Sequence, residues 1–296
     1  MSGRAWLVFI VLGIIWGVPY FFIHVAVQSV SPIIVAWGRL TLAAMVLVPV
    51  AWRRGALAGL REHFGAVIAF AIIEFAVPLT AISFSEQWIP SSVAGIMVAT
   101  APLLIALTSR FFGVHERLGP WRALGLGLGL MGVVTLLGFG TITGVRSWMG
   151  IGLMLIATLG YAIGPLIIER RFHGVDSLGP VAGSVGVASL ALLLPAALDF
   201  PRKLPGAVAL SSIAVLGLVC TATAMLLMFH LVKQAGASRA SIVTYVNPAV
   251  ATLLGIGILH ERLGPGGIPG FGLILLGSWL ATRSAAGARE SAPTAA

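Results

Sequence analysis

The sequence predicts an all-α polytopic membrane protein in which ten transmembrane helices form two inverted five-helix repeats. Three observations lead to this fold class. The chain is 58% hydrophobic and only 9% charged. It contains ten apolar runs of about 20 residues, the length that crosses a bilayer core as a helix. A long stretch that begins at Ser92 occurs again from Ser238 with the same landmarks, and such repetition predicts a duplicated fold.

The composition places the chain in a membrane. A soluble domain carries roughly 25% charged residues, whereas this chain carries 9% and has a mean hydropathy of +1.04. The one cysteine, Cys220, lies in an apolar run, so we expect no disulfide framework. The net charge of +9 does not indicate a nucleic-acid partner, because the basic residues are scattered between apolar runs without a basic patch. The expected surroundings are a lipid bilayer.

The apolar runs follow one another with short connections, and no soluble domain fits between them. The first five belong to a first repeat (1–145) and the next five to a second, inverted repeat (146–283), while small residues predict a disordered cytoplasmic tail (284–296). The predicted spans are 5–23, 33–52, 64–84, 89–109, 121–139, 148–168, 177–198, 207–232, 238–259 and 267–283.

The fourth and ninth spans show the repetition most clearly. They begin at Ser92 and Ser238, each has a proline ten residues later, and each is followed by His-Glu-Arg-Leu-Gly (115–119 and 260–264). The offset is 146 residues at the start and 145 at the end. An odd number of spans per copy forces the second copy to enter the membrane upside down, which is the inverted-repeat design of many secondary transporters.

Lysine and arginine predict the orientation, because cytoplasmic loops carry an excess of both. With a cytoplasmic N-terminus, 13 of them lie inside and 4 outside, and Arg39 falls within the second span. Both termini are therefore expected in the cytoplasm.

Prolines interrupt the spans that carry small-residue faces. Pro102 and Pro248 lie in the middle of the fourth and ninth spans, and Pro78 lies in the third. Such faces indicate either close packing of helices or a cavity lining, and a proline kinks a helix because it removes one backbone hydrogen bond. We expect all three prolines to act as hinges or gates, with the polar Asn247 beside Pro248 facing a solute.

Three ionisable side chains within predicted spans are candidates for a functional role: Glu74, Arg39 and His230. Glu74 is open to three interpretations: a proton-carrying site, an anchor for a solute ammonium group, or a structural partner of Arg39 or His230. Arg39 could instead extend to the outer membrane surface. His230 could be a proton relay or a hydrogen-bonded structural residue.

Aromatic residues occupy matched positions in the two copies. Trp16 and Tyr20 lie in the first span, the 145-residue offset places Trp16 on Tyr161, and Tyr245 lies three residues before Pro248. They could line a binding cavity or anchor the helices at the membrane interface. Glycines in the fifth and tenth spans indicate close helix packing. No metal-ligand spacing, phosphate-binding loop or hydrolase motif occurs, so we expect no metal, no cofactor and no enzymatic activity.

Landmarks of a known family are spread over essentially the whole chain. They are Trp16-Gly17, Pro32, Arg39, Ser92, Ala94, Pro102, Glu116-Arg117 and Gly125 in the first half, and Gly236-Ala237-Ser238, Tyr245, Pro248, Glu261-Arg262, Gly270 and Gly277 in the second. With these residues the chain resembles the EamA-type branch of the drug/metabolite transporter superfamily, and within it the bacterial aromatic amino acid exporters. The resemblance implies a ten-helix carrier in a bacterial inner membrane that exports amino acids or other small metabolites from a central cavity.

The sequence thus predicts a secondary transporter that exports neutral, aromatic amino acids or similar small metabolites across the inner membrane by alternating access. The residues expected to contact solute are Trp16, Tyr20, Glu74, Tyr161, His230, Tyr245 and Asn247. Protons are a candidate coupling ion. A carrier of drugs or of another metabolite is the alternative within the same superfamily, and a channel is the alternative of a different class.

Overall fold

The computed structural model describes residues 3–108, 120–138, 144–172, 174–235 and 241–290. Within these ranges all regular secondary structure is helical. The elements are α1 (Gly3–Gly17), α2 (Pro19–Val27), α3 (Pro32–Arg53), α4 (Phe64–Phe70), η1 (Ala71–Ala76), α5 (Val77–Ser85), α6 (Ser91–Val98), α7 (Ala101–Thr108), α8 (Pro120–Gly138), α9 (Val145–Arg171), α10 (Leu178–Leu198), α11 (Ala207–Ala214), η2 (Val215–Thr223), α12 (Ala224–Ala235), η3 (Ser241–Tyr245), α14 (Asn247–Gly257) and α15 (Gly267–Glu290).

Six apolar helical stretches in the described residues are long enough to cross a membrane: Gly3–Val27, Pro32–Arg53, Phe64–Ser85, Val145–Arg171, Leu178–Leu198 and Ala207–Gln234. Shorter apolar helices cover Ser91–Ile105, Ala123–Gly138, Val243–Gly257 and Gly267–Leu280. Helices suit a bilayer because they satisfy their own backbone hydrogen bonds. The fold is that of a multi-pass membrane protein, as the composition predicts.

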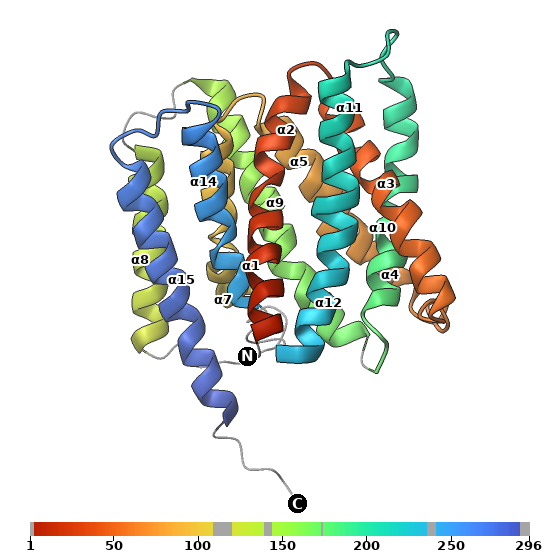
Figure 1. The fold of residues 1–296 in the computed structure, drawn as a ribbon. Coiled ribbons are helices and arrows are strands. Elements are labelled where there is room, and N and C mark those ends of the chain that lie inside the picture. Colours follow the sequence, from red (N-terminus) through yellow and green to blue (C-terminus); the bar gives the residue numbers. More distant parts are fainter. Residues whose placement is uncertain (1–2, 109–119, 139–143, 173, 236–240, 291–296) are drawn as a thin grey trace, which may run out of the picture.

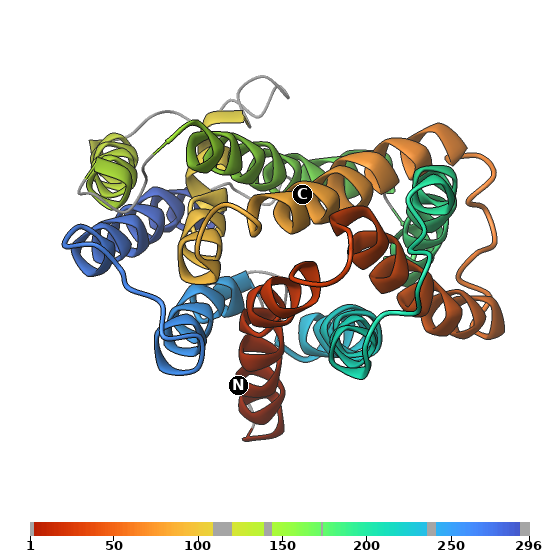
Figure 2. The ribbon, with the colours of Figure 1, turned by 90° about the horizontal axis from the view of Figure 1, so that it is seen from above.

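The helices stand side by side as one bundle, with α8 and α15 paired at its edge (Figures 1 and 2). Helix α1 begins and α15 ends at the same end of this bundle (Figure 1). Large apolar side chains such as Leu190 and Leu194 of α10 are exposed, at 70% and 69% of their surface. Such an apolar exterior faces lipid without cost.

Helices of the two sequence halves interleave in the interior. Residues of α2, α6, α9, α14 and α15 share the largest buried apolar cluster, while α3, η1 and α10 share a second and α1, η3 and α12 a third. Each cluster therefore needs helices from both halves. The bundle packs as one body because neither half buries its apolar faces alone.

Glycines bring α8 and α15 together as the sequence predicts. A side chain at Gly132 would lie 2.7 Å from the backbone nitrogen of Ile274, and one at Gly270 would lie 2.7 Å from the carbonyl oxygen of Gly132. The absence of Cβ atoms lets the two backbones touch. This pairing lies within one chain.

Helix α15 continues to Glu290 and thus extends seven residues into the segment 284–296 that the sequence predicts as a tail. Residues 291–296 lie outside the described part of the chain, as do the first copy of the pentapeptide (115–119) and the second copy's opening Ser238.

Candidate functional site

The predicted fourth and ninth spans are both broken immediately before their prolines. In the fourth, α6 ends at Val98 and α7 starts at Ala101, followed by Pro102. In the ninth, the 3-10 helix η3 gives way to α14, where Pro248 occupies the first turn. Proline has no N–H to donate to the preceding turn, so the helix can restart at that point with little cost.

At the first break the carbonyl of Ala99 loses its helical donor and accepts a hydrogen bond from a neighbouring helix. Leu103 N donates to Thr100 O at 2.9 Å instead of to Ala99 O. The hydroxyl of Ser278, on α15, donates to Ala99 O at 3.0 Å. A neighbouring helix therefore stabilises the broken conformation.

A wider helical turn occurs at matched places in the two copies. The π-helical segments η1 and η2 contain Glu74 and Cys220, which are 146 residues apart. In η2 the hydroxyl of Thr221 donates to Leu216 O, five residues earlier, at 2.8 Å. Single π-helical turns concentrate at functional sites because they redirect side chains. Pro78 follows η1 in the first turn of α5.

Glu74 lies against α9. A side chain at Gly164 would collide with Glu74 Oε2, and one at Gly160 would lie 2.7 Å from Pro78 Cγ. Glu74 Oε2 is buried without a hydrogen-bond partner among the described residues. An unpartnered carboxylate inside a membrane protein is costly and marks a candidate site. Gly164 makes room for Glu74, and Gly160 makes room for Ile73 and Pro78.

Arg39 lies inside the bundle, with 9% of its surface exposed. Its Nε donates to Thr221 Oγ1 at 2.8 Å and thereby joins α3 to η2. The alternative of an arginine extended to the membrane surface is wrong, because the side chain is enclosed by helices. An ion pair between Arg39 and Glu74 is absent from the described residues, although a positive charge buried near the centre attracts anionic groups.

Two of the predicted aromatic residues lie in the main buried cluster. Tyr20 is 6% exposed, and its ring atoms would lie 3.5 Å and 3.7 Å from a side chain added at Gly95 of α6. Tyr161 of α9 packs against the same cluster and is half-buried. Trp16 instead packs with the α1–α12 cluster. Tyr20 thus lies beside the broken helix α6. Tyr161 lies on α9, the helix whose Gly164 faces Glu74.

Asn247 and Tyr245 flank the second break, and both are half-buried. Asn247 Oδ1 is buried without a hydrogen-bond partner among the described residues, and its backbone oxygen would lie 2.8 Å from a side chain at Gly17 of α1. His230 lies apart from this region: it is exposed, and its Nε2 is 2.9 Å from Gln234 Nε2.

The N-terminus of α6, in the first half of the chain, is capped by a residue from the second half, which the sequence did not predict. Glu261, in the second pentapeptide, accepts hydrogen bonds from Ser91 N at 2.7 Å, from Ser92 N at 2.9 Å and from Ser92 Oγ at 2.5 Å. A carboxylate suits this place because the N-terminus of α6 has free N–H groups and a positive dipole end. The sequence did hold a signal for this contact, because the repeated stretch begins with a serine and is followed by a glutamate in both halves.

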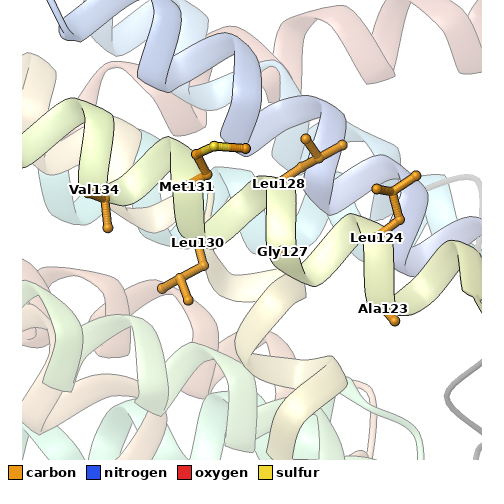
Figure 3. Close-up of a pocket in the computed structure, with 7 residues that line it drawn as sticks. All are labelled: Ala123, Leu124, Gly127, Leu128, Leu130, Met131 and Val134. Carbon is orange, nitrogen blue, oxygen red and sulfur yellow. The ribbon is translucent and has the colours of Figure 1, made fainter.

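Two pockets differ in character. One of about 560 Å³ lies against α8 and is lined by apolar side chains between Ala123 and Val134, which point away from the helix in Figure 3. It has no group that could bind a polar solute. The other, of about 280 Å³, contains His24, Glu86, Glu261 and Arg262. In the described residues, no three His, Cys, Asp or Glu side chains are placed to hold a metal ion.

Known proteins resemble the chain over nearly its full length. The EamA-like transporter family matches residues 3–138 and 148–283. The uncharacterized inner membrane transporter YedA of Escherichia coli is 31% identical over 261 residues, 85% of this chain and 82% of that protein. An uncharacterized transporter of Archaeoglobus fulgidus is 25% identical over 288 residues, 95% of this chain and 99% of that protein. A solved crystal structure with 21% identity covers 96% of this chain and 99% of its own, with a TM-score of 0.67, so the fold is shared.

Proposed function

Because the chain belongs to the EamA-like transporter family, we propose that it exports neutral, aromatic amino acids or similar small metabolites by alternating access. Membership makes it a membrane transporter and not an enzyme. The observation that carries the proposal is the matched pair of helices broken before Pro102 and Pro248. Both lie beside buried aromatic and polar side chains.

The proposed topology is ten spans in two inverted repeats, 1–145 and 146–283, followed by a cytoplasmic tail. Both termini lie on the cytoplasmic side of a bacterial inner membrane. The 13 to 4 distribution of lysine and arginine supports this orientation. Matched π-helical segments and matched proline breaks in the two halves support the repeat. In an inverted pair, the two breaks serve opposite sides of the membrane.

The solute site is proposed beside the two broken helices, where α2 and α9 pack against α6. Tyr20 and Tyr161 offer ring surfaces and hydroxyl groups for an aromatic solute, and Trp16 and Tyr245 extend this set toward α1 and η3. Such rings bind flat apolar groups with a large buried area. His230 stays in the proposal only as a contact made in another conformation, since it is exposed here.

The charged head of an amino acid needs groups of both signs. Glu74 is the proposed acceptor for the ammonium group, and Asn247 is its polar companion. Within the described residues, Glu74 Oε2 and Asn247 Oδ1 are buried without a hydrogen-bond partner. Arg39, buried in the same bundle and bonded to Thr221, is the proposed positive partner for the carboxylate of the solute. The two unpartnered oxygens favour a polar solute over an apolar drug, which would leave both without hydrogen bonds.

Hinge action is proposed for Pro78, Pro102 and Pro248, since each begins a helical segment after an irregular turn. Such turns absorb backbone rotation while the flanking helices stay rigid. This favours a carrier over a channel, because a carrier must close one side as it opens the other.

The test is a panel of labelled amino acids in proteoliposomes, with and without a pH gradient. Saturable exchange of tryptophan, phenylalanine and tyrosine supports the proposal. Transport of dyes or nucleosides without amino acids would point to the drug or metabolite alternative, and single-channel conductance would point to the channel.

A further inference from the structure

The polar pocket at the end of α5 contains a buried acid that the solute site does not use. The pocket lies where α2, the turn after α5 and the segment after α14 meet, so it spans both matched family regions. If the proposed orientation holds, this end of the bundle faces the outside. The polar side chains that line the pocket are His24, Gln28, Glu86, Gln87, Glu261 and Arg262.

Glu86 is enclosed more completely than the other acids of the pocket. Its side chain is 1% exposed, and both carboxylate oxygens are buried without a hydrogen-bond partner among the described residues. An ionised carboxylate buried to this extent costs several kcal/mol unless it is well paired. The neutral acid avoids this cost, because protonation removes the charge.

A second negative charge lies beside it. Glu261 lines the same pocket, and both its oxygens accept hydrogen bonds from backbone N–H groups at the N-terminus of α6. Helix α9 packs against the turn after α5 from the other side. There the hydroxyl of Ser147, the residue after Arg146, donates a hydrogen bond to Trp88 O at 3.3 Å. Two neighbouring carboxylates cannot both be ionised cheaply.

The remaining charged and titratable neighbours come from α2, α3 and the pocket wall. Burial, and after it the charge of Glu261, hold the pKa of Glu86 well above its ordinary value, while Arg39 and the backbone N–H of His24 oppose this shift. Tyr20 and His24 of α2 complete the surroundings, and His24 Nδ1 is itself buried without a hydrogen-bond partner among the described residues. Arg262 lines the pocket opposite them.

The burial of the two Glu86 oxygens limits which ion can bind to them. The two oxygens of Glu86 have no accessible surface for a sodium ion or an ammonium group. Either would need to touch an oxygen directly and to gather further ligands. A proton needs neither space nor extra ligands.

We propose that Glu86 is a proton-binding site of the transporter, protonated in this conformation and deprotonated through the pocket when the contact between Glu261 and α6 opens. The acid O–H bond breaks, the proton passes to water or to His24, and a carboxylate remains. Because Glu261 both borders Glu86 and caps α6, opening that contact changes the surroundings of Glu86. The coupling rests on the proposed transport cycle, whereas the protonation does not.

The protonation is tested by infrared spectroscopy of the purified protein without solute. At neutral pH the wild type should show a protonated-carboxyl C=O band with a component that E86Q lacks and E74Q retains. In E261Q this component should titrate at lower pH, because one negative neighbour is gone. A band that is identical in wild type and E86Q overturns the proposal. If E86Q does not fold, E86D is used instead, and its protonated-carboxyl component should be shifted from that of the wild type. An unshifted component in E86D also overturns the proposal.

The coupling is tested by labelled tryptophan exchange in proteoliposomes across a range of pH. The wild-type rate should vary with pH, and the E86Q rate should not. An E86Q rate that keeps the wild-type pH profile overturns the coupling. If the wild type moves no tryptophan, the proposed solute fails, while the infrared result still decides whether Glu86 carries a proton.

Discussion

Replacing Glu261 with alanine should destabilise the protein by removing the cap of α6. The carboxylate accepts two backbone hydrogen bonds and one from a hydroxyl, at 2.7, 2.9 and 2.5 Å. Loss of a helix cap costs about 0.5–2 kcal/mol, and hydrogen bonds to a charged group contribute roughly 1.5–3 kcal/mol each. Part of this is offset because the carboxylate regains full hydration when the protein unfolds. We expect a loss of about 2–4 kcal/mol in the free energy of unfolding.

The assay is unfolding by a denaturing detergent in mixed micelles, followed by circular dichroism. Glu261→Gln, which keeps one acceptor oxygen, should lose about half as much as Glu261→Ala. The matched control is Glu62→Ala, since Glu62 is exposed and lies outside the helices. If Glu261→Ala and Glu62→Ala unfold at the same detergent fraction, the cap contributes nothing and the reasoning is refuted.

Three further substitutions test the solute site. Gly164→Ala should reduce tryptophan exchange and destabilise the protein by about 1–3 kcal/mol, because the added methyl group collides with Glu74; Gly152→Ala on the same helix has open space and should be neutral in both measurements. Glu74→Gln should abolish ammonium recognition or proton coupling, so a variant with unchanged tryptophan uptake and pH dependence would exclude both roles. Pro248→Ala should slow exchange at least tenfold by letting η3 and α14 join, whereas Pro195→Ala, near the end of α10, should leave the rate within twofold.

Much of the fold can be predicted from the sequence because membrane spans are local features. The apolar run 64–84 and the helical stretch Phe64–Ser85 agree within one residue at either end. The kinks at Pro102 and Pro248 were predictable for the same reason, since proline disrupts its own preceding turn. The π-helical turn around Glu74 was not, because it depends on how α9 and α10 pack against η1 rather than on residues 71–76 alone.

The candidate site was only partly predictable. The repeat matched Trp16 with Tyr161, but it is Tyr20 that shares the main buried cluster with Tyr161, while Trp16 packs against another cluster. Glu86 was overlooked because it follows the end of a span, where an acid ordinarily meets water. Its burial comes from α2 and from the segment after α14, which are distant in the sequence.

The sequence by itself determined the membrane environment, the apolar helices, the duplication and the places where the helices break, because each depends on composition or on a residue's own backbone. Only the tertiary structure decided what each polar side chain meets. Glu261 reaches Ser92 across 169 residues, Arg39 reaches Thr221 across 182, and Glu74 lies on Gly164. Such contacts follow from which helices become neighbours, and that choice is made by the burial of faces over the whole bundle.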